Sequence, residues 1–448
     1  MARRTESGEA YDFYLRGLEL AREPSKDGLL RAVRYYEQAL TINPDFAAAH
    51  GAIASAWIWL EDYGGVASQE AFDRAEPAAQ RALELDPTRA DALTAMGFLE
   101  ERKYDNIPAA RDYFERALAA NPTFTEASTL YADALLDLGE TATALRVRRD
   151  AVERDPLSSF LKSRLVSQLS TMGRSEEAER LLDEIFAANP DDTYGFEELG
   201  NRRFIDGRLA ESVKAYMFLH DNRPGDPYAA ANLAICYALM LMPDQAQTWV
   251  AAARTRGAGN RWELQARRSI AQWQGDWDAM FRVGQLYLAK NGSTWQGQAS
   301  LGKHDWEAAR ASFQRTHSRL KYRPGDEPSA NVLESLSGLA LAEKRLGLES
   351  WASHAAAARQ LAEKKIKDSM SLGTWPNINL TYLLAQLAAV NDDTEQAVKY
   401  MEEARDQNFL QHTFIEHDPF FELLRDEPRL LAIAKEMRER ALAERRKL

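Results

Sequence analysis

Small and large apolar residues recur along the chain at helical spacing, and turn residues interrupt them at a fixed interval. Four prolines follow one another at steps of 34 residues, and three glycines keep the same step, each 17 residues after one of those prolines. Glycine ends one helix because it accepts a positive φ, and proline stops the next from continuing. Two interruptions per period predict a repeated helix–turn–helix unit. The residues are Pro122, Pro156, Pro190, Pro224, Gly139, Gly173 and Gly207.

Between these interruptions, alanines and aromatic residues stand where two packed helices need them. The small residues allow two backbones to approach closely, and the larger ones fill the groove beside them. A generic helical bundle with coincidental spacing is the alternative, and three consecutive equal proline steps argue against it. The strings are Ala32, Tyr36, Ala39 and Pro44; Ala110, Phe114, Ala117 and Pro122; and the weaker Ala75, Ala79, Ala82 and Pro87.

This period and this A-x3-F…P pattern resemble the tetratricopeptide repeat. The resemblance implies an all-α fold, a tetratricopeptide-type α-solenoid in which antiparallel helix pairs form a right-handed superhelix. We expect a regular array of about seven pairs in residues 1–258, divergent pairs in 259–408, and a capping segment and helix in 409–448. Further turns are expected at Glu23-Pro24-Ser25, Gly64-Gly65, Gly275, Gly302, Gly347 and Asn391-Asp392.

The first helices of such pairs line a concave face, whose side chains are free to touch a partner. The second residue of three successive first helices is aromatic: Phe160, Tyr194 and Tyr228. Three rings one repeat apart suit the apolar side chains of an extended or helical segment. The alternative is that these rings only pad neighbouring helices.

Asn201 and Asn232 resemble the asparagine pair by which chaperone-binding tetratricopeptide domains hold a peptide backbone and its terminal carboxylate. An amide offers a donor and an acceptor together, as an extended backbone requires. The resemblance is partial, because Glu197 stands where the first lysine would be, and Asn232 also suits a helix contact. Positive charge is available nearby from Arg202, Arg203, Arg261, Arg267 and Arg268.

Five tryptophans crowd the irregular middle of the chain, and tryptophan is enriched at interfaces. They are a possible secondary interface, or the site of a small ligand in a sensing module. Filling wide gaps between imperfectly packed repeats is the alternative role. The residues are Trp262, Trp273, Trp277, Trp295 and Trp306.

Charge and motif content exclude several function classes. The net charge of −12 argues against nucleic acid as the main partner. The single Cys236 suits a reducing compartment. The charged start has no apolar stretch behind it, so no signal peptide is expected, and no 18-residue apolar run could cross a membrane. His412 and His417 do not share a helical face, so no metal site is expected. We therefore expect no enzyme activity, no cofactor and a cytoplasmic location.

Residues 10–17, 32–40 and 418–429 resemble the tetratricopeptide portions of bacterial regulators, in which the array follows a winged-helix or an adenylate cyclase domain. Neither effector domain is present, so neither DNA binding nor cyclase activity is implied. The resemblance implies a scaffold or sensory module in a bacterial regulatory complex, and a periplasmic location stays open. The leading hypothesis is an adaptor that binds another protein or peptide segment. A third hypothesis is self-association, with a mass that is a multiple of 50.5 kDa.

Overall fold

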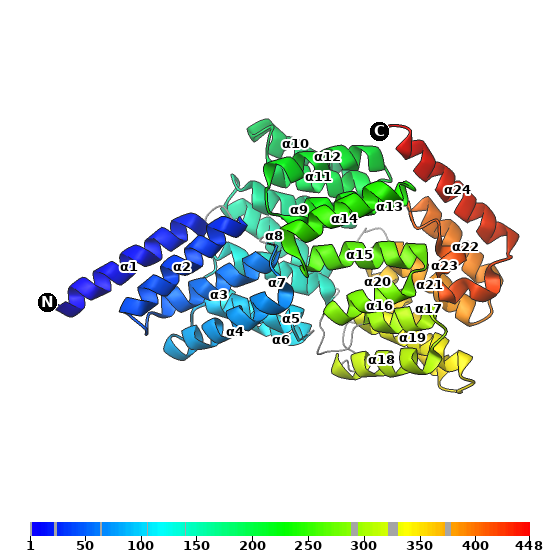
Figure 1. Ribbon diagram of the computed structural model, residues 1–448, viewed down its shortest axis with the longest axis horizontal. Helices are drawn as coiled ribbons and strands as arrows, with labels where there is room; N and C mark the ends of the chain where they lie inside the picture. The colour runs from blue at the N-terminus through cyan, green and yellow to red at the C-terminus, as the bar shows by residue number, and fades with distance from the viewer. Residues whose placement is uncertain are drawn as a thin grey trace. The chain divides into compact units, whose positions relative to one another are not determined.

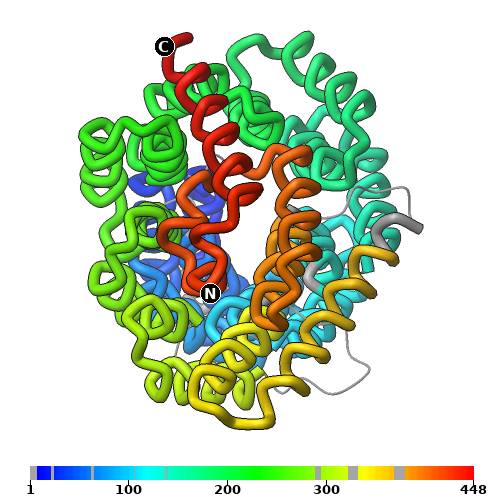
Figure 2. The backbone as a smooth tube through the Cα atoms, turned by 90° about the vertical axis from the view of Figure 1, so that its right-hand side faces the viewer, coloured from blue at the N-terminus to red at the C-terminus, as the bar shows by residue number. Residues whose placement is uncertain are grey.

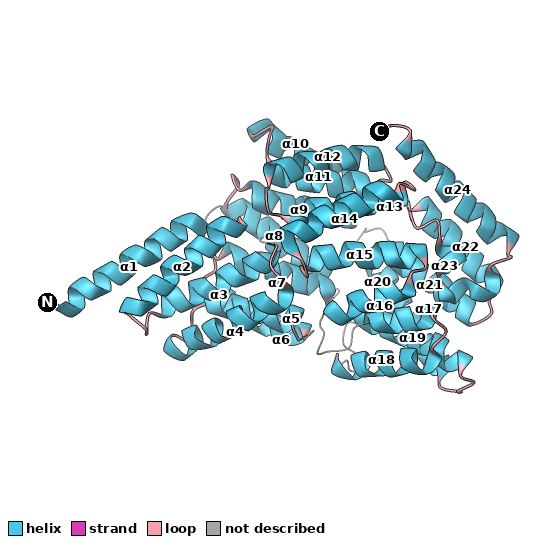
Figure 3. Ribbon diagram, viewed as in Figure 1, coloured by secondary structure: helices cyan, strands magenta, loops and turns pink. Residues whose placement is uncertain are grey.

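The computed structural model describes residues 2–21, 25–62, 65–104, 106–138, 140–287, 294–320, 330–371 and 378–448. All regular structure in these ranges is helical, with no strand among them (Figures 1 and 3). The prediction of an all-α, tetratricopeptide-type array of helix pairs is confirmed. None of the described helices has the length and apolar character needed to cross a bilayer. Four predicted turn residues, Glu23, Pro24, Gly64 and Gly139, lie outside the described residues.

The helices follow one another in pairs at the predicted period. The first helices begin at Ser159, Thr193 and Pro227, so Phe160, Tyr194 and Tyr228 are second residues, as predicted. The first seven pairs are α1 (Ala2–Ala21) with α2 (Lys26–Ile42), α3 (Ala47–Asp62) with α4 (Ser68–Leu85), α5 (Ala90–Arg102) with α6 (Ile107–Ala120), α7 (Thr125–Asp137) with α8 (Thr141–Arg154), α9 (Ser159–Thr171) with α10 (Ser175–Ala188), α11 (Thr193–Ile205) with α12 (Leu209–Asn222), and α13 (Pro227–Leu239) with α14 (Pro243–Gly257).

The later pairs contain some shorter helices. They are α15 (Arg261–Gln274) with α16 (Trp277–Leu286), α17 (Thr294–Gly302) with α18 (Trp306–Arg319), α19 (Ala330–Arg345) with α20 (Trp351–Ser371), and α21 (Ile378–Val390) with α22 (Thr394–Asp406). The chain ends with the one-turn helix α23 (Phe414–His417), the 3-10 helix η1 (Pro419–Leu424) and α24 (Pro428–Arg445). In Figure 2 the trace of α19 to α22 runs back and forth, yellow to orange, as these pairs require.

Small residues and aromatic rings join the two helices of a pair. A Cβ built on Gly97 would lie 2.5 Å from the ring of Phe114, and one on Gly200 would lie 2.6 Å from the ring of Tyr216. Such contacts require glycine, because a methyl group has no room there. The alanines of the predicted strings, Ala32, Ala39, Ala75, Ala79, Ala82, Ala110 and Ala117, are all fully buried.

One predicted turn forms in a different way. Gly302 is the last residue of α17, and the positive φ of that turn, 59°, falls on His304. A Cβ on Gly302 would lie 2.1 Å from the indole ring of Trp277. Glycine is therefore required there by the close approach of a tryptophan and not by backbone conformation. At Gly173, Gly207, Gly275 and Gly347 the expected positive φ is present.

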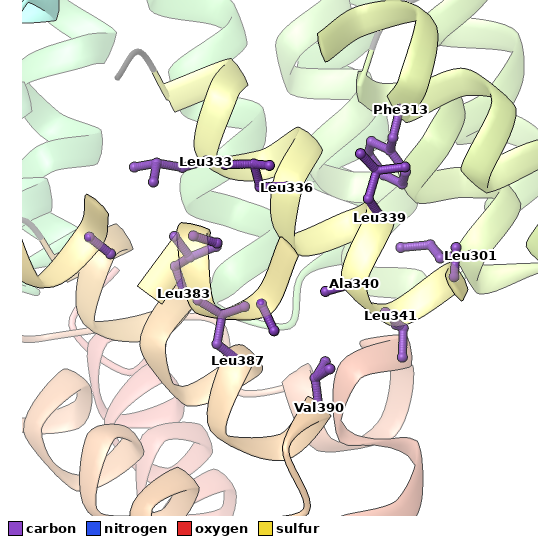
Figure 4. Close-up of a cluster of buried hydrophobic side chains, with 14 of the residues drawn as sticks. Leu301, Phe313, Leu333, Leu336, Leu339, Ala340, Leu341, Leu383, Leu387 and Val390 are labelled. Carbon is purple, nitrogen blue, oxygen red and sulfur yellow. The ribbon is translucent and has the colours of Figure 1, made fainter. Parts of the chain in front are cut away.

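One core cluster of the later pairs takes side chains from successive helices between α17 and α21 (Figure 4). Phe313 of α18 is fully buried beside Leu339 of α19, and Leu336 of α19 and Leu383 of α21 belong to the same cluster. Trp306 and Trp351 pack against this cluster from its edge. A single helix pair cannot bury its apolar face alone. The burial of aliphatic side chains from successive helices therefore stabilises the stack of pairs.

The chain divides into two compact units, each of which we describe by itself. Unit 1 comprises Met1–Arg164, His220–Ala230 and Ala251–Glu263, and unit 2 comprises Leu165–Leu219, Ala231–Val250 and Leu264–Leu448. The division into a regular array, divergent pairs and a cap stays a prediction.

In unit 1 the segment 256–260 returns to the turn between α3 and α4. The side-chain amide of Asn260 donates to the carbonyls of Glu61, at 2.5 Å, and Val66, at 3.3 Å. A Cβ on Gly257 would lie 2.6 Å from the Cα of Gly65, so the two backbones touch. These contacts join residues almost 200 positions apart.

In unit 2 the C-terminal segment returns to the ends of α12 and α13. The Glu444 carboxylate accepts from the backbone N–H of Ala210, at 3.1 Å, in the first turn of α12. Nη1 of Arg445 donates to the Leu241 carbonyl, and Nε2 of His412 lies 3.2 Å from the Leu239 carbonyl. In Figure 2, α24 is the red helix that carries two of these side chains, and it also packs against α22.

Candidate partner-binding pocket

A pocket in unit 1 is built entirely from first helices. Each lining residue that the structure describes lies on α3, α5, α7, α9 or α15, which are the first members of their pairs. The space at the pocket, counted together with the open solvent at its mouth, is about 450 Å³. The lining residues are Ile58, Trp59, Phe98, Arg102, Thr129, Leu130, Asp133, Phe160, Arg164 and Arg261.

Aromatic rings form one wall of the pocket. The rings of Trp59 and Phe160 meet edge to face, with centroids 6.2 Å apart and an interplanar angle of 79°. Phe160, predicted from the repeat register as a partner contact, therefore does line a pocket, together with a tryptophan from a helix about 100 residues earlier. The contact with Trp59 fits the alternative role of packing against another helix, and a partner-binding role for Phe160 stays a prediction.

Guanidinium groups stack on these rings. The Cζ atom of Arg102 lies 5.6 Å from the centroid of Phe98, and that of Arg164 lies 5.4 Å from the centroid of Phe160. In each case the arginine follows its aromatic residue by one helical turn, which brings the two side chains together on one face. Stacking orients the planar group and stabilises the cation.

Two carboxylates lie close to this wall, and each has internal partners. Asp133 lines the pocket and forms an ion pair with Arg148 of α8, whose side chain is only 5% exposed. Glu126 accepts from Ser55 Oγ at 2.7 Å and from the Trp59 indole. Burial raises the pKa of Glu126 above its ordinary value, although these two hydrogen bonds lower it. Glu126 therefore fixes the orientation of the Trp59 ring.

The return segment adds the last cation. Asn260 is fully buried and bonded to the α3–α4 turn, and the next residue, Arg261, projects from the start of α15 into the pocket lining. The guanidinium of Arg261 lies 4.0 Å above the ring of Trp262. Trp262 in turn meets Tyr228 edge to face at 4.7 Å. Two of the residues singled out from the sequence thus help to hold Arg261: Trp262 directly, and Tyr228 through its contact with Trp262.

The other predicted groove residues belong to unit 2. Tyr194, Asn201 and Asn232 are all partly buried. The Oδ1 of Asn201 accepts from Tyr216 Oη at 2.7 Å, so the amide helps to hold α11 against α12. Arg202 and Arg203, considered as sources of positive charge, both bind Glu179, at 2.6 and 2.8 Å. A peptide-binding role for this group stays a prediction.

Four of the five clustered tryptophans also belong to unit 2. All four, Trp273, Trp277, Trp295 and Trp306, are partly buried. Trp277 and Trp295 pack against a small core formed by Ala271, Met280 and Ala299. Trp306 packs against the core cluster drawn in Figure 4 and stacks on His304. Their contacts favour the gap-filling role, and their role as an interface stays a prediction.

Sequence reasoning missed Trp59, Arg102, Arg164 and the pocket role of Arg261. A signal for two of them was present: Phe98 with Arg102, and Phe160 with Arg164, are aromatic–arginine pairs four residues apart on first helices. In the ranges that the structure describes, no group of three or more His, Cys, Asp or Glu side chains is placed to hold a metal ion.

The sequence matches no family model and no curated protein. Among solved structures, the chain is similar to the APC/C hetero-tetramer Cut9–Hcn1, with 13% identity and a TM-score of 0.43, over 96% of this chain and 87% of that one. It is also similar to PilF of Pseudomonas aeruginosa, with 15% identity and a TM-score of 0.31, over 47% of this chain and 95% of that one. Similarities this remote carry no argument about what the chain binds.

Proposed function

We propose that this protein is a non-enzymatic interaction scaffold, which binds a segment of a partner protein in the first-helix pocket of unit 1. The observation that supports the proposal most is the origin of the pocket, whose described lining comes only from first helices. In stacked helix pairs this is the face that neighbouring repeats do not cover. A partner segment there touches several repeats at once.

The chemistry of the lining suits a peptide. Aromatic rings and arginines are the residues that contribute most to protein interfaces, because they combine a large contact area with directional bonds. Trp59 and Phe160 provide the area, and the stacked guanidiniums provide the bonds. Glu126 and Asn260 hold this wall in place before any ligand arrives, which reduces the entropy cost of binding.

The cellular setting is a further part of the proposal. The resemblance of residues 10–17, 32–40 and 418–429 to bacterial regulators supports a role in a bacterial regulatory complex, and the single Cys236 supports a cytoplasmic location. Tyr194, Asn201 and Asn232 are proposed as an additional contact surface on unit 2.

Site-specific photocrosslinking tests the pocket. A benzoylphenylalanine placed at Phe160 lies in the lining, whereas the same residue at Glu153 lies exposed on the second helix α8. The proposal predicts that Phe160 crosslinks to one defined segment of one partner, and that Glu153 does not. A synthetic copy of that segment should then bind the purified chain and block the crosslink. Identical products from both positions, or a segment that does not compete, would contradict the proposal.

A further inference from the structure

We infer that the segment bound by this pocket is acidic and carries an aromatic side chain between its carboxylates. This inference rests on the proposed function, because it specifies the chemistry of the segment that the pocket holds. It follows from the charges of the lining, the geometry of the guanidiniums and the apolar surface between them.

The lining is positive although the chain is acidic. Among the described residues, it contains three guanidiniums, of Arg102, Arg164 and Arg261, and one carboxylate, of Asp133. That carboxylate is paired with Arg148 in the adjoining helix. The whole chain carries a net charge of −12, which repels anions at long range. An acidic segment must therefore be recognised through short-range contacts with these arginines.

The guanidiniums can serve a ligand even where they have internal partners. A guanidinium has five N–H donors in a fixed plane. Arg102, for example, pairs with Glu101 through Nε at 2.9 Å, and a single carboxylate cannot take up all five donors of a guanidinium. Carboxylates match this planar fork with two parallel bonds, whereas amides and hydroxyls offer a single neutral acceptor. A segment without carboxylates would therefore gain less binding free energy from each arginine.

The apolar surface explains why an aromatic side chain belongs between the carboxylates. Ile58, Trp59, Phe98, Leu130 and Phe160 separate the arginines, and two of these rings already meet edge to face. A third ring can add to such a pair at an offset or an edge and bury more apolar area. A free dicarboxylate supplies the charges and leaves this surface uncovered. The lining therefore favours an acidic peptide over a small acid.

Calorimetry with four matched nonapeptides and the full-length chain tests the inference. The peptides are blocked at both ends and share a serine and glycine background around the cores Glu-Phe-Glu, Gln-Phe-Gln, Lys-Phe-Lys and Glu-Ser-Glu. We expect the Glu-Phe-Glu peptide to bind at least about tenfold more tightly than each of the others. Glutarate should compete poorly with it.

Variants assign the effect to the pocket. Arg164→Gln and Arg261→Gln, made separately, should each weaken the Glu-Phe-Glu peptide about tenfold and leave the weak binding of Gln-Phe-Gln unchanged. Arg116→Gln, on the exposed face of α6, removes the same charge outside the pocket and should change neither. Circular dichroism melting checks that each variant is folded. Because the two pocket arginines lie on different helices, the test still stands on the second variant if the first one does not fold.

Several results would overturn the inference. They are equal binding of the charged and neutral peptides, binding that ignores both arginine variants, glutarate competing as well as the peptide, and no binding of any probe. The proposed function fails separately, in the photocrosslinking at Phe160. If that experiment yields a partner segment without acidic residues, the scaffold stands and the acidic specificity is wrong.

Discussion

The two units join distant parts of the chain by different means. In unit 1 the contact is neutral and steric: the amide of Asn260 binds two carbonyls, and Gly257 lies against Gly65. In unit 2 the contact is charged, with Glu444 at the start of α12 and Arg445 at the end of α13. The first contact should therefore be sensitive to volume, and the second to charge, salt and pH. In unit 1 the contact of Asn260 also positions the next residue, Arg261, in the pocket lining. The rigidity of this contact therefore bears on the proposed binding of a partner.

The largest effect is expected where two backbones touch. Gly257→Ala puts a methyl group 2.6 Å from the Gly65 Cα, and no side-chain rotation can relieve a clash with backbone. We expect the free energy of unfolding to fall by about 2 kcal/mol, measured by urea denaturation. The matched control is Gly8→Ala, a helical glycine with nothing within 4 Å, which should be neutral or slightly stabilised. Equal effects of the two variants would refute the steric account.

The amide contact of unit 1 should come next. Asn260→Ala leaves the buried carbonyls of Glu61 and Val66 without their amide donor, which costs about 2 kcal/mol at most. Hydrogen exchange should also quicken at residues 65–67. Gln265→Ala, at an exposed position of the same helix α15, is the control. Because the contact is neutral, the decrease in the free energy of unfolding should not change with salt. A strong salt dependence would contradict the assignment of this decrease to the neutral amide contact.

A smaller and salt-sensitive effect is expected in unit 2. Glu444→Gln keeps an acceptor for the Ala210 N–H but removes the negative charge from the first turn of α12. The helix dipole should make this cost about 0.5 to 1 kcal/mol at low ionic strength and less in high salt. Glu439→Gln, on the exposed face of α24, should cost nothing measurable. A loss that is independent of salt would show that hydrogen bonding, not charge, dominates.

The smallest effect is a dependence on pH. Burial lowers the pKa of His412 below its ordinary value, with a smaller lowering by Arg438, and the Leu239 carbonyl and Glu416 oppose the shift. A lower pKa in the folded state means that the unfolded chain takes the proton first. Stability is therefore present above the unfolded pKa of about 6.5 and is lost as the pH falls from there toward the folded value.

The variant His412→Gln isolates this contribution, because glutamine can still donate to the Leu239 carbonyl and does not titrate. Unfolding between pH 7.5 and pH 5.5 should show a shallower loss of stability in the variant than in the parent chain. Parallel curves would mean that His412 does not contribute to the pH dependence of the contact.

Local pattern was enough to predict the helix pairs. The 34-residue step of Pro122, Pro156, Pro190 and Pro224 fixes where each pair ends, and the structure places Phe160, Tyr194 and Tyr228 as second residues of their helices. These features depend on neighbouring residues within one or two repeats, which is the range over which a sequence period carries information.

Contacts between distant repeats could not be predicted in the same way. Whether residue 260 meets residue 61 depends on the small rotation from each pair to the next, summed over several pairs, and no local pattern encodes that sum. Asn201 shows a second limit. Its spacing from Asn232 suggested a peptide contact, whereas its amide binds Tyr216 on the following helix, and spacing does not reveal which neighbour takes an amide.

The central claim, that a partner segment occupies the first-helix pocket, is tested most directly by hydrogen exchange of the full-length chain with and without the crosslinked segment. The account predicts slower exchange in α3, α5 and α9 around Trp59, Phe98 and Phe160, and unchanged exchange in α4, α6 and α8. Protection confined to the second helices, or none in unit 1, would contradict it.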